Sequence, residues 1–237
     1  MNTKTEYAPG LWIQDKRIPL KLSQFKLIAF DMDSTLINIE CIDEIADVVG
    51  FKSEVAAITD AAMRGVITDY KESLRQRVAL LEGAPATALN IVYEEKLRLN
   101  PGAHKLIETC QKAGLKTLLV SGGFTYFTDR VRDTLGINFT RSNVLEIRDG
   151  LLTGKMIPQD WGDICDGEEK KRMLLTTCSS LGILPEQSIA MGDGANDLPM
   201  MSVAGLSVAF HAKPKVRDSA QVAIDTGGLD RLLEIVQ

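Results

Sequence analysis

The stretch Lys26–Leu36 constrains the fold more than any other part of this chain. Four apolar residues, Leu27 to Phe30, are enough for one buried strand, and two carboxylates, Asp31 and Asp33, follow almost at once. Ligands of doubly wound α/β sheets bind beyond the carboxyl ends of the strands, where these side chains would stand. The stretch alone fits two interpretations. It is either a ligand site in which a cation or a shared proton relieves the repulsion, or a cap on the next helix.

The pattern that follows the first strand is helical. From about Glu40 to Arg98, apolar residues recur at helical spacing without a strand signal, and glycines divide the region into three or four short helices. From residue 101 onward, helix and strand patterns alternate, which is typical of parallel βαβ units. We predict strands over 115–120, 188–191 and 206–210, a hairpin within 144–153, and a final helix over 229–236.

These patterns predict an α/β fold: a doubly wound, mostly parallel sheet with a helical cap inserted after the first strand. We expect residues 1–25 to form an N-terminal extension, 26–39 and 99–237 the core, and 40–98 the cap.

Three of the predicted strands end in polar turns: at Asp31, at Ser121-Gly122-Gly123 and at Gly192-Asp193-Gly194. If the strands are parallel neighbours, the three turns meet at one edge of the sheet. With Asp197, the turns would gather four carboxylates, which need a divalent cation for balance. Oxygen donors without histidine or cysteine favour Mg²⁺, which usually shares its shell with a substrate phosphate.

Two features could hold that phosphate. The Ser121-Gly122-Gly123 turn offers a hydroxyl and backbone N–H groups ahead of a helix, although by itself it also fits a tight turn without chemistry. Lys170 could supply positive charge or lie on a solvated helix face, and Lys171 beside it leaves the choice of residue open.

Composition narrows the partners and the compartment. A net charge of -5 argues against nucleic acid or an anionic membrane as the main partner, and no apolar run is long enough to span a bilayer. The first twenty residues contain no apolar signal region, so we expect the chain to stay in the cytoplasm. Four scattered cysteines are expected to be reduced thiols, and two histidines argue against a histidine-rich zinc site.

Four motifs together resemble those of the haloacid-dehalogenase (HAD) superfamily of phosphatases. They are Asp31-Met-Asp33-Ser-Thr, Ser121-Gly-Gly, Lys170 and Gly192-Asp-Gly-Ala-Asn-Asp197. Within that superfamily, the chain is similar to the phosphoserine phosphatase family over about residues 26 to 225. The further matches are Asn38-Ile-Glu40, Ile42-Asp-Glu44, Ala62-Met-Arg-Gly65, Ser73-Leu-Arg-Gln-Arg-Val78 and His211-Ala-Lys-Pro-Lys215. Residues 158–167 match no motif of the family.

The resemblance implies a HAD-like core and a Mg²⁺-dependent hydrolysis of O-phosphoserine through an aspartyl-phosphate, the last step of serine biosynthesis. Asp31 would attack phosphorus, and Asp33 would act as general acid and then as general base. Asp31, the backbone carbonyl of Asp33, and Asp193 would hold the metal.

The resemblance also assigns the residues around the substrate. Ser121, Gly122 and Lys170 would hold the phosphoryl oxygens, with Asn196 and Asp197 orienting Lys170 and the metal-bound waters. In the cap, Glu40 would meet the substrate ammonium and Arg77 its carboxylate, while Met63 and Tyr70 would close over it. By spacing alone, Glu40 fits a helix cap and Arg77 a solvated helix face.

Other functions stay open. The chain could be a phosphotransferase or another small-molecule phosphatase of the same fold, or a non-catalytic module that binds a phosphometabolite. The pair Asp31 and Asp33 speaks against the last, because a binding module needs neither a nucleophile nor an acid. We expect a small phosphomonoester as the partner, and either a monomer or a homodimer.

Overall fold

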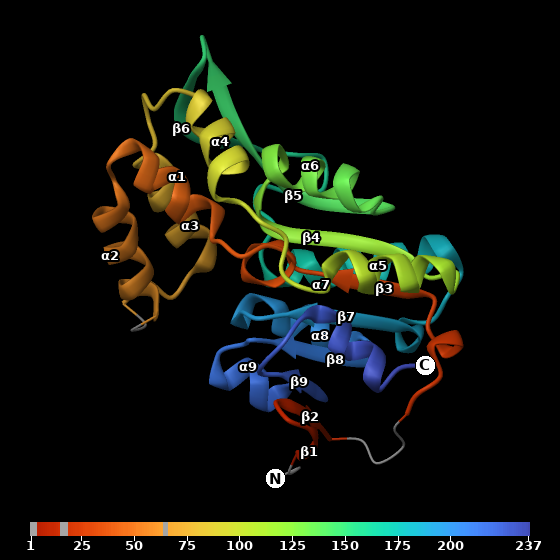
Figure 1. The fold of residues 1–237 in the computed structure, drawn as a ribbon. Helices are drawn as coiled ribbons and strands as arrows, with labels where there is room; N and C mark the ends of the chain where they lie inside the picture. Colours follow the sequence, from red (N-terminus) through yellow and green to blue (C-terminus); the bar gives the residue numbers. More distant parts are fainter. Residues whose placement is uncertain (1–3, 15–18, 64–65) are drawn as a thin grey trace.

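The centre of the molecule is a nine-stranded sheet in the order β1-β2-β9-β8-β7-β3-β4-β5-β6 (Figure 1). The computed structural model describes residues 4–14, 19–63 and 66–237, with only the backbone of Met63. The strands are β1 (Thr5–Ala8), β2 (Leu11–Ile13), β3 (Leu27–Phe30), β4 (Lys116–Phe124), β5 (Phe139–Arg148), β6 (Leu151–Ile157), β7 (Ser188–Gly192), β8 (Leu206–Phe210) and β9 (Val222–Ile224).

The helices lie along the sheet and in the segment between β3 and β4. They are α1 (Cys41–Val49), α2 (Lys52–Met63), α3 (Tyr70–Ala79), α4 (Thr87–Ile91), α5 (Ala103–Lys112), α6 (Thr125–Leu135), α7 (Gly167–Leu181), α8 (Leu198–Val203) and α9 (Pro214–Ser219). None of the helices in the described part of the chain is both long and apolar enough to cross a membrane.

Most of the sheet is parallel. Strands β9, β8, β7, β3, β4 and β5 pair in parallel with their neighbours, and antiparallel pairing is confined to the two ends, at β1–β2–β9 and β5–β6. The predicted doubly wound, mostly parallel α/β fold is confirmed.

The alternation of side chains along β3 separates the core into two layers. Ile28 and Phe30 belong to the cluster that includes the buried side chains of α5 and α6, whereas Leu27 and Ala29 pack with those of α7 and α8. Figure 1 shows these helix pairs on opposite faces of the sheet. Because both faces are covered, β3 is apolar at every position, as the sequence predicts for a buried parallel strand.

The N-terminal residues contribute to this sheet. In β2, Leu11 is fully buried and pairs with Ile224 of β9, while Trp12 stacks against the Arg217 guanidinium. The sequence predicts an extension over residues 1–25 and no strand there. The hairpin β1–β2 is therefore a finding of the structure, and it closes the β9 edge.

The described residues from 41 to 96 form four α-helices and one π-helical turn. Backbone hydrogen bonds join this helical segment to the β5–β6 hairpin: Gly83 N–H donates to Leu152 O, and Leu152 N–H donates to Ala84 O, both at 2.8 Å. The hairpin, which the predicted division assigns to the core, therefore also contacts the helical segment. The division itself stays a prediction.

Two predicted boundaries are wrong. Ser121-Gly122-Gly123 is predicted as a turn after the strand, but β4 continues through these residues to Phe124. The final helix predicted over 229–236 is a 3₁₀ helix over Leu229–Glu234. Glycine pairs usually mark turns, and here they mark an irregular stretch inside a strand.

Removing the Leu11 side chain should test whether the N-terminal hairpin is part of the core. We expect Leu11→Ala to lower the free energy of unfolding by about 2–5 kcal/mol, because a buried leucine loses its contacts and leaves a cavity. Tyr7→Ala in β1 is the control. Because Tyr7 is 45% exposed, this substitution should lower the free energy of unfolding far less. Urea denaturation of both variants measures the difference. Equal losses would contradict the placement of β2 in the core.

Candidate active site

The carboxyl ends of three neighbouring strands meet at one edge of the sheet. Strand β3 lies between β7 and β4, and Phe30, its last residue, aligns with Met191 of β7 and Leu119 of β4. Asp31 follows β3 directly, and Asp193 follows β7. The predicted convergence of the polar segments is thus confirmed.

The backbone after β3 is irregular. Residues Met32–Leu36 form a π-helical turn, interrupted by Asp33, which is extended, and by Ser34, whose φ of 55° lies in the left-handed region. Non-glycine residues rarely adopt this conformation, and it is found at functional sites where the surroundings enforce it. Within the turn, Met32 N–H donates to Asp31 Oδ1 at 2.7 Å, which orients the first carboxylate.

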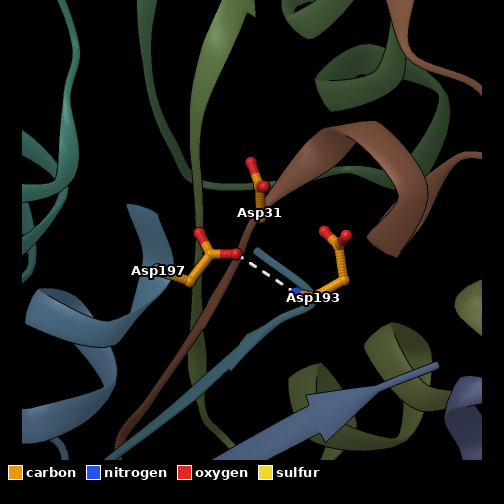
Figure 2. A group of neighbouring side chains, drawn as sticks. All are labelled: Asp31, Asp193 and Asp197. Carbon is orange, nitrogen blue, oxygen red and sulfur yellow. Dashed lines mark hydrogen bonds between the residues drawn. The ribbon is translucent and has the colours of Figure 1, made fainter. Parts of the chain in front are cut away.

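Asp31, Asp193 and Asp197 form a cluster in which carboxylate oxygens lie within 4.8 Å of one another (Figure 2). The Lys170 ammonium lies at 2.8 Å from Asp31 Oδ1 and 2.7 Å from Asp197 Oδ1, and its side chain is fully buried. Lys171 instead lies near Glu168, so the structure brings Lys170 and not its neighbour to the cluster.

The three carboxylates differ in their free oxygens. Both oxygens of Asp197 are used: Oδ1 accepts from Lys170, and Oδ2 accepts from the N–H groups of Asp193 (3.1 Å) and Gly194 (3.0 Å). Among the described residues, Asp31 Oδ2 accepts no hydrogen bond, and the carboxylate of Asp193 accepts only a long one, from Thr35 Oγ1 at 3.3 Å. Asp31 and Asp193 are therefore better candidates for metal ligands than Asp197.

The charges of this cluster fit a divalent cation. Three carboxylates lie around one buried ammonium, and all three would offer oxygen atoms as metal ligands. Burial, and then the charge of Asp197, raise the pKa of Asp193 to about 7. Burial would lower the pKa of Lys170, but Asp197 and Asp31 outweigh it and raise that pKa well above its usual value. A hard cation at Asp31 and Asp193 would relieve the repulsion that these shifts reflect.

Asp33 has one held and one free oxygen. Cys41 N–H donates to Oδ2 at 3.3 Å, whereas Oδ1 is buried and accepts no hydrogen bond from the described residues. Burial, followed by the charge of Glu40, raises the pKa of Asp33 to about 8. A carboxyl group with that pKa carries a proton at neutral pH, as a general acid requires. The sequence analysis does not predict Cys41 or Thr35 as site residues. Thr35 belongs to the first motif, and its position there is the signal that could have identified it.

Two of the predicted phosphate-binding residues, Ser121 and Gly122, lie near the carboxyl end of β4, the strand that pairs with β3. Gly123 N–H donates to Ser121 Oγ at 2.9 Å, and Gly122 faces helix α3. A side chain at Gly122 would collide with Tyr70, because its Cβ would stand 2.1 Å from Tyr70 Oη. Any larger residue here would therefore displace the Tyr70 hydroxyl. Asn196 lies in the 3₁₀ turn Ala195–Asp197 and is half-buried.

The predicted cap residues lie at different distances from the cluster. Tyr70 begins α3 and reaches Gly122, whereas Glu40 is exposed and accepts a 2.7 Å hydrogen bond from Ser34 Oγ. Arg77, half-buried on α3, donates from Nε to Ser73 O at 3.3 Å and forms no ion pair within 4.0 Å with the residues that the structure describes. The side chain of Met63 lies outside the described residues.

Residues 158–167, which match no family motif, contact α3. Asp163 lies 2.9 Å from Lys71 Nζ and 2.6 Å from an Arg75 nitrogen. The segment then continues through Cys165 into α7, which carries Lys170. It therefore connects the helix of Tyr70 and Arg77 with the helix of the buried lysine.

Comparison with known proteins agrees with this geometry. The sequence model of the haloacid dehalogenase-like hydrolases matches residues 25–205, which include the motifs on β3, β4, α7 and β7. The chain therefore belongs to the haloacid dehalogenase-like hydrolase family.

The chain is similar to several phosphoserine phosphatases. That of Polaromonas sp. strain JS666 is 70% identical over 233 residues, covering 98% of this chain and 99% of the relative. That of Albidiferax ferrireducens is 69% identical, covering 98% of each chain. A phosphoserine phosphatase structure described as a phospho-aspartyl intermediate analogue has a TM-score of 0.82 and 36% identity, covering 90% of this chain and 99% of the other.

The raised pKa values predict how stability changes with pH. Asp33 and Asp193 have folded pKa values of about 8 and 7, above the roughly 3.9 of an unfolded aspartate, so the folded state binds more protons in this window. Without metal, the free energy of unfolding should therefore fall as the pH rises from about 5 to 8. Urea titrations with a chelator at both pH values measure the slope.

Asp193→Asn provides the matched variant for this prediction. The amide cannot titrate, so the variant should lose less stability than the wild type between pH 5 and 8, by at least about 1 kcal/mol. Mg²⁺ at about 100 times its dissociation constant should stabilise the wild type by about 2.7 kcal/mol at pH 8, and the variant much less. A wild type that gains stability with rising pH would contradict the prediction.

Proposed function

We propose that this chain is a Mg²⁺-dependent phosphoserine phosphatase, which hydrolyses O-phospho-L-serine to L-serine and phosphate. The observation that carries the proposal is the buried Lys170 between Asp31 and Asp197, in a carboxylate cluster that also contains Asp193. Full-length identity of 70% to a phosphoserine phosphatase supports the choice of substrate. In this proposal, residues 40–98 are the cap and residues 26–39 with 99–237 the core.

The proposed reaction begins at Asp31. Its carboxylate attacks phosphorus, the bond from phosphorus to the serine oxygen breaks, and Asp33 donates its proton to that oxygen. Met32 N–H and Lys170 hold Oδ1 of Asp31, which limits the rotation of the nucleophile. Water then attacks the aspartyl-phosphate, Asp33 takes a proton from this water, and phosphate leaves. The related phospho-aspartyl analogue supports a covalent intermediate.

The remaining residues of the site stabilise charge. Asp31, Asp193 and the backbone carbonyl of Asp33 would hold Mg²⁺, which would neutralise charge on the phosphoryl oxygens. Lys170, the Ser121 hydroxyl and the Gly122 backbone would bind these oxygens, whose charge grows in the transition state. Asp197 keeps Lys170 charged and oriented through its 2.7 Å contact.

The cap would select the amino-acid part of the substrate. Arg77 would bind the carboxylate and Glu40 the ammonium, with Met63 and Tyr70 closing over the substrate. We further propose that the protein acts in the cytoplasm, because its four cysteines are buried and unpaired, which suits a reducing compartment.

Replacing the two catalytic carboxylates should separate their roles. We expect Asp31→Asn to abolish phosphate release without loss of fold, since the amide keeps the shape but is no nucleophile. Asp33→Asn should slow turnover by about 10²–10⁴-fold, which is the usual worth of general acid–base catalysis. Phosphate release and thermal unfolding are measured for both. Substantial turnover by Asp31→Asn would rule out the covalent mechanism.

A substrate panel tests the assignment of phosphoserine. Phosphoserine should be preferred over phosphothreonine, phosphoethanolamine, 3-phosphoglycerate and a sugar phosphate. Arg77→Ala should lower kcat/KM for phosphoserine by about 10- to 150-fold, the cost of a lost charge-assisted hydrogen bond. Phosphoethanolamine lacks the carboxylate, so its already low kcat/KM should change little.

Arg75→Ala is the control, because it removes the same charge from the exposed side of α3. It should leave the preference for phosphoserine unchanged. A sugar phosphate or phosphoglycerate that outperforms phosphoserine would refute the substrate, although the phosphatase chemistry could stand. Preferential transfer of phosphate to homoserine over water would favour a phosphotransferase.

A further inference from the structure

The parallel ladder between β4 and β5 is interrupted at the proposed phosphate site. Val120 pairs with Arg141, and the next pair is Phe124 with Asn143, so β4 uses four residues for a step that takes two in β5. The extra length bends Ser121-Gly122-Gly123 away from the regular ladder. Bulges of this kind often occur beside active sites, where they redirect a side chain.

A bulge leaves some backbone groups without a hydrogen-bond partner in the neighbouring strand. The side chain of Asn143 supplies a partner for one of these groups. Its side chain is 1% exposed, and Nδ2 donates to the carbonyl of Gly122 at 2.8 Å. On the other side of the amide, Oδ1 accepts from Cys165 N–H, also at 2.8 Å. Buried backbone groups need such partners, so this side chain satisfies one carbonyl and one N–H.

The same contacts fix the peptide between Gly122 and Gly123. In a trans peptide the carbonyl and the N–H point in opposite directions. Asn143 holds the carbonyl, and the Gly123 N–H donates to Ser121 Oγ at 2.9 Å. Since Ser121 Oγ accepts this bond, the hydroxyl proton remains available to donate to another acceptor, such as a phosphoryl oxygen.

The Cys165 contact extends this arrangement to the buried lysine. Cys165 lies two residues before α7, the helix that carries Lys170. One buried amide therefore joins the strand with the Ser121 hydroxyl to the segment that leads to the lysine. Both groups are proposed to bind the same phosphate.

We propose that Asn143 is a positioning residue: it locks the Gly122–Gly123 peptide, and thereby orients the Ser121 hydroxyl for a phosphoryl oxygen. Asn143 does not itself contact the substrate. The inference rests on the proposed function, because it takes Ser121 and Gly122 as the phosphate-binding residues.

The test uses inorganic phosphate as the probe, with the full-length protein and Mg²⁺. Its affinity is measured by calorimetry and as a competitive inhibition constant. Asn143→Ala should weaken phosphate binding by about 5- to 100-fold, the range for a lost hydrogen bond that leaves a buried partner unsatisfied. The stabilisation by Mg²⁺ alone should stay as in the wild type, because Asp31 and Asp193 do not depend on this amide.

Two further variants separate positioning from a structural role. Ser142→Ala is the matched control: it removes a buried 2.7 Å hydrogen bond to Thr128 from the same strand, and should change phosphate affinity by less than about twofold. Ser121→Ala tests whether Asn143 acts through the Ser121 hydroxyl. If Asn143 acts through the Ser121 hydroxyl, Asn143→Ala should weaken phosphate binding much less in the Ser121→Ala background.

Each outcome decides the inference. A folded Asn143→Ala that binds phosphate within twofold of the wild type would overturn it, as would additive effects with Ser121→Ala. If Asn143→Ala does not fold, Asn143→Asp is the second variant. It keeps the shape and the oxygen that accepts from Cys165 N–H, but it turns an oxygen instead of an NH₂ group toward the Gly122 carbonyl. It should weaken phosphate binding at least as much as predicted for Asn143→Ala. If the wild type neither hydrolyses phosphoserine nor binds phosphate, the proposed function itself is overturned. If the wild type is active and the Asn143 variants bind phosphate as well as it does, only this inference is overturned.

Discussion

The contact of the Lys170 ammonium with Asp31 and Asp197 is the interaction on which the rest of the site depends. A fully buried ammonium is tolerated only when opposite charges lie in direct contact, and both carboxylates are within 2.8 Å. Asp197 in turn accepts the N–H groups of Asp193 and Gly194, so the turn after β7 is held by the same charge. The end of β3, helix α7 and the turn after β7, which are far apart in sequence, are thereby fixed around the ammonium of Lys170.

Buried ion pairs are expensive to desolvate and contribute little net stability. The net negative charge that remains around Lys170 is better explained by ligand binding than by folding. In the proposed function, this charge would attract a divalent metal, and the ammonium with nearby N–H groups would bind the phosphate that accompanies it. The proposed site thus combines a cation-binding half, at Asp31 and Asp193, with an anion-binding half at Lys170 and Ser121.

Much of this arrangement could be predicted from sequence, for a physical reason. Buried parallel strands are short apolar runs, and their carboxyl ends must lie at one edge, so the residues after Phe30 and after β7 could be brought together without coordinates. The divalent cation expected beside Asp31, Asp33 and Asp193 followed from this edge. The catalytic roles predicted for Asp31 and Asp33, and the roles predicted for Glu40 and Arg77, came from the family resemblance.

What could not be predicted depends on tertiary contacts. Lys170 and Lys171 are adjacent on one helix and differ only in the face on which they lie, so the sequence leaves them equivalent. The strand β2 pairs with a segment more than 200 residues away and carries no strong local signal. Asn143 belongs to no motif, because its importance arises from a bulge in β4 that a glycine pair makes look like a turn.

The attachment of the helical segment to the sheet limits how it can move. Backbone hydrogen bonds hold it at two separate places: where the chain enters and leaves, with Asn100 N–H donating to Leu36 O at 2.8 Å, and at the β5–β6 hairpin through Gly83 and Leu152. A rigid body held at two points can turn only about the line that joins them. Any opening that keeps both attachments is therefore a rotation about that line, and it works against the ion pairs that join Lys71 and Arg75 of α3 to Asp163.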